Sequence, residues 1–404
     1  MDFVLRYVSR HAAFLPVLVL CLGTLGRGVM NSLLFLYFIF ALSAVFYHVK
    51  HNDYRLPKNI GVIGIIWFCL FSGAMLSLFY NDAFDVGIKH WGIALLSSAT
   101  VFFTLLLPFK TSGLYSNKGL AIIVLFALAY VGVKLFVCVL DEVCIPAVSV
   151  STMVVPIVAS FLLFTFHHFI VKNWFLWFSL FLILVTALLV FADSRTEVLM
   201  VLMVHLLIAV FYYRKSLLIL FVPILFLVVV MFFSLFLQHG EVNPDSDIKD
   251  MIYTLSSNRI EIWERSVTNP PPNQLLGVGI DNTAAYLPKK KNRHGSALHN
   301  AYLEMWYENG LLWLGLWLGL FIYLLKNIRT VYTQAEGKHR AIYTAFLGSF
   351  VAVLTAGMLD KGYLSIYFTF FIFYLGAMLY RLGEPEAFDE FNDEKKPRLK
   401  KPIT

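Results

Sequence analysis

Residues 217–237 read LLILFVPILFLVVVMFFSLFL and contain no charged side chain. At an α-helical rise of about 1.5 Å per residue, a stretch of this length crosses a hydrocarbon layer of about 30 Å. Similar blocks cover most of the 404-residue chain, in which hydrophobic residues make up 59% and charged residues 14%. A soluble domain could not bury so much apolar surface. The sequence therefore predicts an all-α polytopic membrane protein.

Uncharged blocks of this kind predict about 12 transmembrane helices. They lie near residues 11–26, 31–48, 60–80, 90–109, 119–139, 150–170, 174–192, 196–213, 217–237, 303–325, 341–359 and 363–380. Lysine and arginine are concentrated in the segments on one side of this arrangement, whereas the short loops of the other side hold only Arg27, Lys89, Arg195 and Lys361. By the positive-inside rule, both termini are expected in the cytoplasm.

This topology divides the chain into four parts. Residues 1–237 hold the predicted helices 1–9, residues 238–302 form one large loop between helices 9 and 10, residues 303–380 hold helices 10–12, and residues 381–404 form a charged tail. The loop lies on the outer face, which is the periplasm if the membrane is a bacterial inner membrane. Its proline and glycine residues predict ordered loops with short helices, and the tail is expected to be disordered.

The basic character of the chain, with a net charge of +7, does not indicate a nucleic-acid partner. The basic residues flank apolar blocks and are better explained as determinants of topology. The cysteines Cys21, Cys69, Cys138 and Cys144 form no CxxC motif and no group with histidine. We therefore expect neither a zinc site nor a disulfide scaffold. No cofactor is expected.

The segment DSRTE at residues 193–197 stands between two very apolar predicted helices. Polar residues are costly at membrane depth, so this segment is a candidate site. One interpretation is a tight turn whose Arg195 reaches to lipid headgroups. The other is an anion clamp, because a planar guanidinium with five donors suits a phosphate.

The segment SNRIEIWER at residues 257–265 has the spacing of a short amphipathic helix. Arg259 falls near its start and Arg265 near its end. The simpler interpretation is an interfacial helix anchored by Trp263, with solvated arginines. A basic entrance to a polyprenyl-phosphate site would have the same pattern.

The segment LHNAYLEMWYENG at residues 298–310 leads from the large loop into the next predicted helix. His299 at this junction is a candidate general base, because an imidazole titrates near neutral pH, although a structural histidine is also common there. Glu304 and Glu308 share one helical face and either line a cavity or lie above the hydrocarbon.

A basic cluster precedes this segment. It consists of Lys289, Lys290, Lys291 and Arg293. The cluster is either a solvated loop or a docking site for an anionic glycolipid.

The order of these elements resembles the O-antigen ligase and O-antigen polymerase superfamily. The resemblance rests on Ser194-Arg195, on Arg259 with Trp263, on the GVG at residues 277–279, on HNAYLE at residues 299–304, and on the predicted layout of spans. It implies a fold similar to GT-C glycosyltransferases and a glycan donor linked to undecaprenyl diphosphate. Many relatives carry a second histidine two positions before the first, where this chain has Ala297.

The resemblance also implies roles for the candidate residues. Arg195 and Arg259 would hold the donor diphosphate, with Arg265 replacing or assisting Arg259, and His299 would activate the acceptor hydroxyl. Residues expected to bind the acceptor or to support the site are Asn300, Glu304, Lys289, Lys290, Lys291 and Arg293. Two arginines can offset the charge that develops on a diphosphate leaving group, so no metal is expected.

Several functions remain open at this point. The favoured one is an O-antigen ligase that transfers glycan to lipid A-core. This chain has one large late loop where polymerases often have two, and the cluster from Lys289 to Arg293 could face the phosphates of a lipid A-core acceptor. An O-antigen polymerase and a transferase that glycosylates a protein such as pilin share the donor chemistry. A glycolipid transporter is the alternative from another class, but the internal repeats expected of it are not found in the sequence.

Overall fold

The structure is a computed structural model. It describes residues 2–12, 15–16, 18–19, 27–51, 60–80, 84–107, 259–280, 282–287, 298–335, 337–359 and 366–384. Within these ranges the chain forms helices and no strands. Three stretches are long and apolar enough to cross a membrane, namely Asn31–Lys50, Gly87–Leu106 and Ala301–Gln334. The predicted all-α class is confirmed for this part of the chain.

The N-terminal part contains four described helices. They are α1 (Asp2–His11), α3 (Arg27–Lys50), α4 (Ile60–Ser77), which continues into the 3-10 turn η1 (Leu78–Tyr80), and α5 (Phe84–Leu106). The last three occupy the spans expected near residues 31–48, 60–80 and 90–109. Helix α1 is not among the sequence predictions. Its Arg6 Nε donates a 3.0 Å hydrogen bond to the Tyr47 hydroxyl near the end of α3.

The C-terminal part contains α16 (Ala301–Leu324), α17 (Ile328–Gln334), α18 (Gly337–Leu359) and α19 (Ile366–Leu382). Helices α16, α18 and α19 occupy the spans expected near residues 303–325, 341–359 and 363–380. Two short helices precede them, α14 (Arg259–Thr268) and α15 (Thr283–Tyr286). The predicted spans between residues 119 and 237, and most of the one near 11–26, lie outside the described residues.

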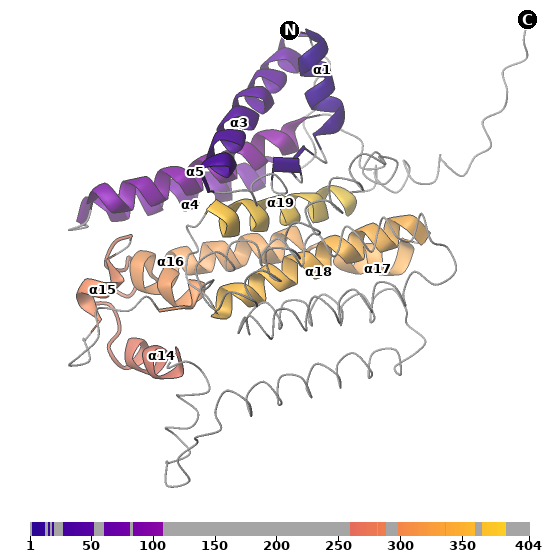
Figure 1. The fold of residues 1–404 in the computed structure, drawn as a ribbon. Helices are drawn as coiled ribbons and strands as arrows, with labels where there is room; N and C mark the ends of the chain where they lie inside the picture. Colours follow the sequence, from indigo (N-terminus) through magenta and orange to yellow (C-terminus); the bar gives the residue numbers. More distant parts are fainter. Residues whose placement is uncertain are drawn as a thin grey trace, which may run out of the picture.

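Helix α19 joins the two parts of the chain. It packs against α18 and α5, and Figure 1 shows it between the purple N-terminal helices and the orange α16 and α18. The Phe373 ring of α19 lies 5.2 Å from Trp317 and 6.1 Å from Phe71. Phe71 and Phe373, which are 302 positions apart in the chain, thus share one apolar core.

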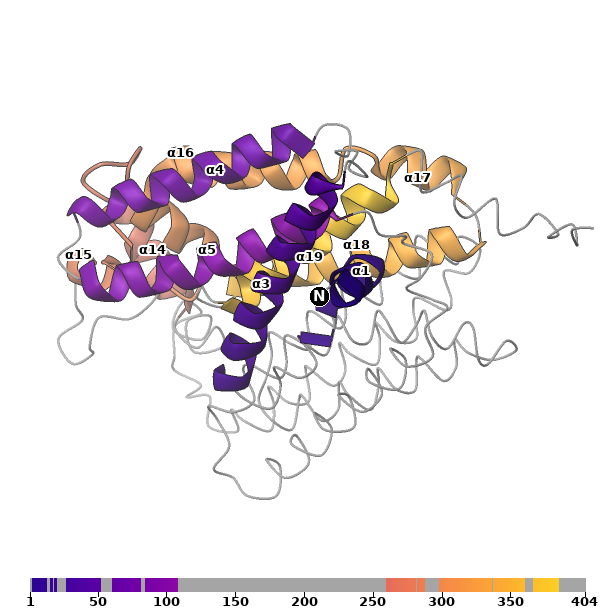
Figure 2. The same cartoon turned by 90° about the horizontal axis from the view of Figure 1, so that it is seen from above.

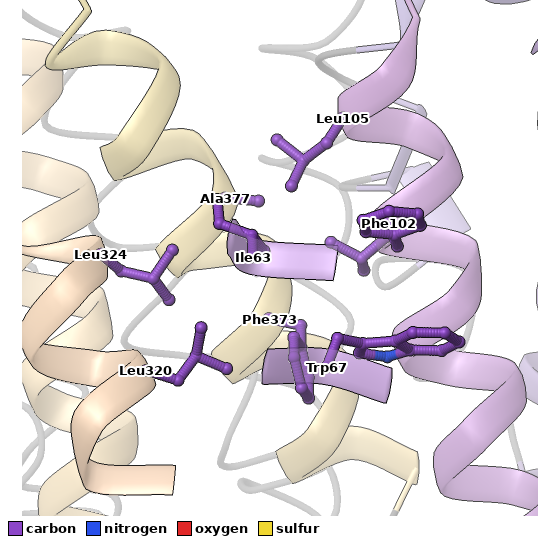
Figure 3. A pocket seen from close by; sticks show the side chains of 9 residues that line it. Ile63, Trp67, Phe102, Leu105, Leu320, Leu324, Phe373 and Ala377 are labelled. Carbon is purple, nitrogen blue, oxygen red and sulfur yellow. The ribbon is translucent and has the colours of Figure 1, made fainter. Parts of the chain in front are cut away.

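Helices α4 and α16 run side by side in opposite directions (Figure 2). Gly73 near the end of α4 lies so close to the Trp313 indole that a β-carbon there would overlap the ring. Near the start of α4, Ile63 lines an apolar pocket together with Leu320 and Leu324 of α16 (Figure 3). The absence of a β-carbon at Gly73 therefore allows the two helices to approach closely.

Polar residues inside α5 are satisfied within the helix. Ser97, Ser98, Thr100 and Thr104 are buried. Each hydroxyl donates to the backbone carbonyl four positions earlier, at distances of 2.8, 2.9, 2.6 and 2.7 Å. These bonds make the hydroxyls compatible with an apolar environment.

The C-terminal helices have two distinct ends. At one end, Lys326 Nζ lies 4.5 Å above the Tyr323 ring and 4.9 Å above the Tyr380 ring. Nearby, His339 Nε2 and the Leu382 carbonyl oxygen are 2.8 Å apart. We call this the Lys326 end. Helices α14 and α15 lie at the opposite end, where α16 begins (Figure 1).

Candidate functional site

Helix α14 carries two of the arginines singled out in the sequence. Arg259 is its first residue and Arg265 lies in its last turn, so the predicted short amphipathic helix is confirmed. Ile262 and Ser266 are buried on the inner side of the helix. Arg265 Nε lies 4.0 Å from a carboxylate oxygen of Glu261, one turn earlier. Part of the Arg265 charge is therefore already offset within the helix.

Trp263 links α14 to the start of α16. Its indole Nε1 donates a 2.9 Å hydrogen bond to the backbone carbonyl of Leu298, the residue before His299. The sequence suggested Trp263 as a membrane anchor. In the structure its polar edge instead holds the segment that carries the candidate base, 35 positions further along the chain.

A small apolar cluster supports this arrangement. It is separate from the main core and contains Ile262, Val278, Leu287, Leu298 and Tyr307, with Leu303 packed against it. These residues come from α14, the GVG loop, the end of α15 and the start of α16. Burying apolar surface is favourable in proportion to the area removed from water. Because the four segments bury their side chains against one another, the cluster holds them together.

His299 has an unusual backbone conformation. Its φ is +50°, in the left-handed region that few residues other than glycine adopt. Asn300 follows as the N-cap of α16, and its side-chain oxygen accepts hydrogen bonds from the Tyr302 and Leu303 amides at 3.0 and 3.1 Å. Asn300 thereby satisfies two amides of the first helical turn, which is a supporting role.

The two glutamates of α16 have different surroundings. Glu304 in the first turn is partly exposed. Glu308 is only 4% exposed, and its carboxylate accepts a 3.0 Å hydrogen bond from the Thr283 hydroxyl of α15. Glu308 thus lies inside the protein and connects α15 to α16, rather than lying in solvent above the membrane.

Helix α16 is broken at Gly310, whose φ of 82° and ψ of 174° are not helical. The break leaves carbonyl groups available, and the GVG loop uses them. The Val278 amide donates to the Tyr307 carbonyl at 3.0 Å, and the Gly279 amide donates to the Glu308 carbonyl at 2.9 Å.

The loop also accepts a bond from the far side of the break. The Leu311 amide donates to the Gln274 carbonyl at 2.8 Å. This approach requires glycine on both partners. A β-carbon on Gly277 would overlap the backbone of α16, and one on Gly310 would overlap the Leu275 carbonyl. Both glycines also have positive φ values.

Some of the predicted site residues lie outside the described residues. These are Arg195, Lys289, Lys290, Lys291 and Arg293. The structure brings together Arg259, Arg265, His299, Asn300 and Glu304 at the end of the bundle where α16 begins. The expected roles of all these residues remain predictions.

Two features of this site have only weak signals in the sequence. Thr283 begins the four-residue helix α15, and no recognisable sequence motif marks it. Gly310 lies inside the predicted span 303–325, and a single glycine is often tolerated in a helix. Gly310 follows the polar pair Glu308-Asn309 and precedes Leu311-Leu312. This change from polar to apolar residues is the signal that could have indicated a break in the helix.

The described residues form helices, three stretches of which are long and apolar enough to cross a membrane, and candidate site residues lie together at one end of the bundle. Residues 178–318 match the family model described as O-antigen ligase. The match supports the family resemblance of the motifs. This stretch contains Arg195, Arg259, Arg265, His299 and the broken part of α16. No curated protein matches the chain.

Proposed function

We propose that this protein is a membrane glycosyltransferase that moves O-antigen glycan from undecaprenyl diphosphate to lipid A-core. The O-antigen ligase family match over residues 178–318 supports a polysaccharide and a lipid as substrates in general, and the specific donor and acceptor are part of the proposal. The observation that carries the proposal for the site is the 2.9 Å bond from Trp263 to the Leu298 carbonyl. It joins the helix that begins with Arg259 to the backbone next to His299.

Arg259 is the better candidate of the two α14 arginines for the donor diphosphate. It begins a ten-residue helix, and the partial positive charge of a helix N-terminus favours a bound phosphate. Arg265 lies in the last turn of the helix, away from this N-terminus, and its Nε is 4.0 Å from a carboxylate oxygen of Glu261. Arg195 would supply the second cation, as the family resemblance implies.

In the proposed reaction, His299 accepts the proton of the acceptor hydroxyl as its oxygen attacks C1 of the donor sugar. The bond between C1 and the phosphate oxygen breaks, and undecaprenyl diphosphate leaves with the bonding electrons. Attack from the side opposite the leaving group inverts the anomeric centre. Arginines close to the diphosphate stabilise its developing charge, so the proposed mechanism is metal-independent.

The acceptor is proposed to be lipid A-core, with the cluster from Lys289 to Arg293 binding its phosphates. The alternative is an O-antigen polymerase, whose acceptor is a second carrier-linked glycan. We propose that the protein lies in the bacterial inner membrane, as the family resemblance implies, with both termini cytoplasmic and the site periplasmic, as the positive-inside rule predicts. Arg6 and Tyr47 are in contact, which agrees with this topology because both are expected at the cytoplasmic side.

The decisive experiment is a deletion strain complemented with the wild-type protein or with His299→Ala. For a ligase, loss of the protein leaves unmodified lipid A-core while long glycan accumulates on the carrier lipid. For a polymerase, the loss leaves core with a single repeat unit. We expect the ligase pattern, and we expect His299→Ala to reproduce the deletion.

The control is the amount of each variant in the membrane fraction. Purified protein mixed with carrier-linked glycan and lipid A-core should form the product without an energy source, which a transporter cannot do. Full transfer by His299→Ala would refute its assignment as the base.

A further inference from the structure

The length of α16 determines how deep the broken segment lies in the membrane. After Gly310 the helix continues to Leu324, a distance of about 21 Å at about 1.5 Å per residue. A hydrocarbon layer of about 30 Å requires more than this. Tyr323, Tyr380 and Lys326 come together at the far end, and tyrosine and lysine are typical of a membrane boundary. The hydrocarbon therefore extends past Gly310 toward the start of α16.

From this boundary, Gly310 lies about 9 Å inside the opposite edge of the hydrocarbon. Tilt of the helix would place it no closer to that edge. The loop that docks on the break must lie at a similar depth, because it is hydrogen-bonded to the residues on both sides of Gly310.

Non-helical backbone is tolerated at membrane depth only when its polar groups are satisfied by the protein. The loop meets this condition over five consecutive amides. The amides of Leu275 and Leu276 donate to the Asn273 side-chain oxygen, both at 3.1 Å. The Gly277 amide donates to the Asn273 carbonyl at 2.7 Å. The amides of Val278 and Gly279 donate to backbone carbonyls of α16.

Two neighbouring side chains of this loop are apolar and exposed, next to the exposed polar residues Asn273 and Gln274. Leu275 is 63% exposed and Leu276 is 40% exposed. Directly beside them on α16, Leu311 is 45% exposed and Leu312 is 53% exposed. The Leu312 amide lies 3.5 Å from the Leu275 carbonyl, so the four leucines form one surface that continues along α16. A patch of this kind is unfavourable in water and favourable in lipid.

We propose that residues 273–279 form a re-entrant loop whose Leu275 and Leu276 lie among lipid acyl chains, in the leaflet at the His299 end of the bundle. The partner is the bulk bilayer. The loop then places the segment around His299 directly above the hydrocarbon. This inference rests on the span of α16 and on the loop contacts, and it does not depend on glycosyl transfer.

The test uses full-length protein in phosphatidylcholine vesicles without any substrate. Cys21, Cys69, Cys138 and Cys144 are replaced by serine, and a single cysteine is introduced by Leu275→Cys or Leu276→Cys and labelled with bimane. Leu312→Cys is the lipid-facing control. Glu264→Cys, at an exposed position of α14, is the water-facing control.

Quenching identifies the environment of each label. We expect lipids brominated in the upper acyl chain to quench the labels at positions 275 and 276 as strongly as the label at 312. Iodide in the water should quench the label at 264 at least threefold more than these. Iodide quenching at 275 and 276 that equals quenching at 264 would overturn the proposal.

A second measurement uses the unmodified chain, so it does not depend on the folding of a variant. Phosphatidylcholine with a photoactivatable acyl chain is incorporated into the vesicles, and crosslinked peptides are mapped. Crosslinks at Leu275 or Leu276, in addition to those on α16, are expected. Crosslinks on residues 311–322 with none on residues 273–279 would refute insertion of the loop.

Discussion

At the residue scale, their positions in α14 distinguish two arginines, because Arg259 begins the helix whereas Arg265 lies in its last turn and forms a pair with Glu261. A surface pair within one helix contributes little to stability, because solvent screens it and ordering the side chains costs entropy. The pair nevertheless directs the Arg265 guanidinium toward its own helix. Arg259 begins the helix and is the residue that we expect to contact the donor.

The first prediction compares the two arginines. Replacing a guanidinium that binds phosphate removes charge-assisted hydrogen bonds of about 1.5–3 kcal/mol, so Arg259→Ala should slow glycan transfer by roughly 10- to 100-fold. Arg265→Ala should have a smaller effect, and Arg259→Lys an intermediate one, since lysine keeps the charge but lacks the planar fork. Transfer rates in proteoliposomes provide the measurement, and a larger loss for Arg265→Ala than for Arg259→Ala would reverse the assignment.

Two substitutions of His299 can distinguish the role of its backbone conformation from the role of its imidazole. Its left-handed φ of +50° costs an ordinary residue about 1–2 kcal/mol, a cost that glycine avoids. We predict that His299→Gly is at least as stable as His299→Ala in thermal unfolding, and that both lose transfer because neither has an imidazole. If His299→Gly retained activity, the residue would serve only the turn.

At the element scale, the hydrogen bonds across the Gly310 break join α16 and the loop at residues 274–279 into one unit. Thr283 and Glu308 add a second link, from α15. Because this carboxylate is buried, its hydrogen bond from Thr283 offsets part of the cost of removing it from water. The end of the bundle that holds the candidate site is thus assembled from α16 together with a loop and α15, which both come before it in the chain.

Two glycines of α16 provide a matched pair for testing this unit. Gly310→Ala should destabilise the protein by at least about 1–3 kcal/mol, because its backbone conformation is strained for alanine and the β-carbon would overlap the Leu275 carbonyl. At Gly315 a β-carbon would meet no atom within 4 Å, so Gly315→Ala should be neutral or stabilising by about 0.5–1 kcal/mol. Thermal unfolding in detergent measures both effects.

The location of the damage is also predicted. Limited proteolysis of Gly310→Ala should cleave within residues 269–282, as the loop detaches from α16, while Gly315→Ala should resist like the wild type. Equal stability and equal resistance of the two variants would mean that the loop does not depend on the break.

At the scale of the whole molecule, the two ends of the bundle use different chemistry. The end at His299 holds the broken helix and the candidate site. At the Lys326 end, the helices are joined by the stacked rings of Tyr323 and Tyr380, by Lys326 above them, and by the buried His339. His339 precedes the apolar stretch Ile342–Met358, and it bridges α18 to the end of α19 through the Leu382 carbonyl.

His339 predicts a pH dependence of stability. Burial lowers the pKa of its imidazole below 6.5, an effect that the hydrogen bond to the Leu382 carbonyl only partly opposes. Below the unfolded pKa of about 6.5, the unfolded chain binds more protons at this site than the folded one, so stability falls as pH falls from about 6.5 to the folded pKa. The midpoint temperature of thermal unfolding of the purified protein should decrease when the pH is lowered from about 7.5 to about 5.5.

His339→Gln provides the control for this effect. Its amide can donate to the same carbonyl but does not titrate, so its thermal midpoint should change less over the same pH range. An unchanged slope in this variant would show that other groups cause the pH dependence.

The sequence by itself determined the class of the protein and the positions of its described membrane helices. Apolar length and the order of polar residues are local properties, so helices such as α3, α4 and α16 could be predicted within a few residues. The amphipathic spacing around Arg259 likewise predicted α14, and the junction at His299 indicated where α16 begins.

Only the tertiary structure decided how these parts meet. The bond from Trp263 to Leu298, the contact of Thr283 with Glu308, and the docking of the loop on Gly310 join residues far apart in the chain. Such contacts leave no periodic pattern, since each depends on the geometry of a surface that forms when the segments pack. The broken α16 could not be foreseen for the same reason, because the hydrogen bonds that stabilise the break come from another part of the chain.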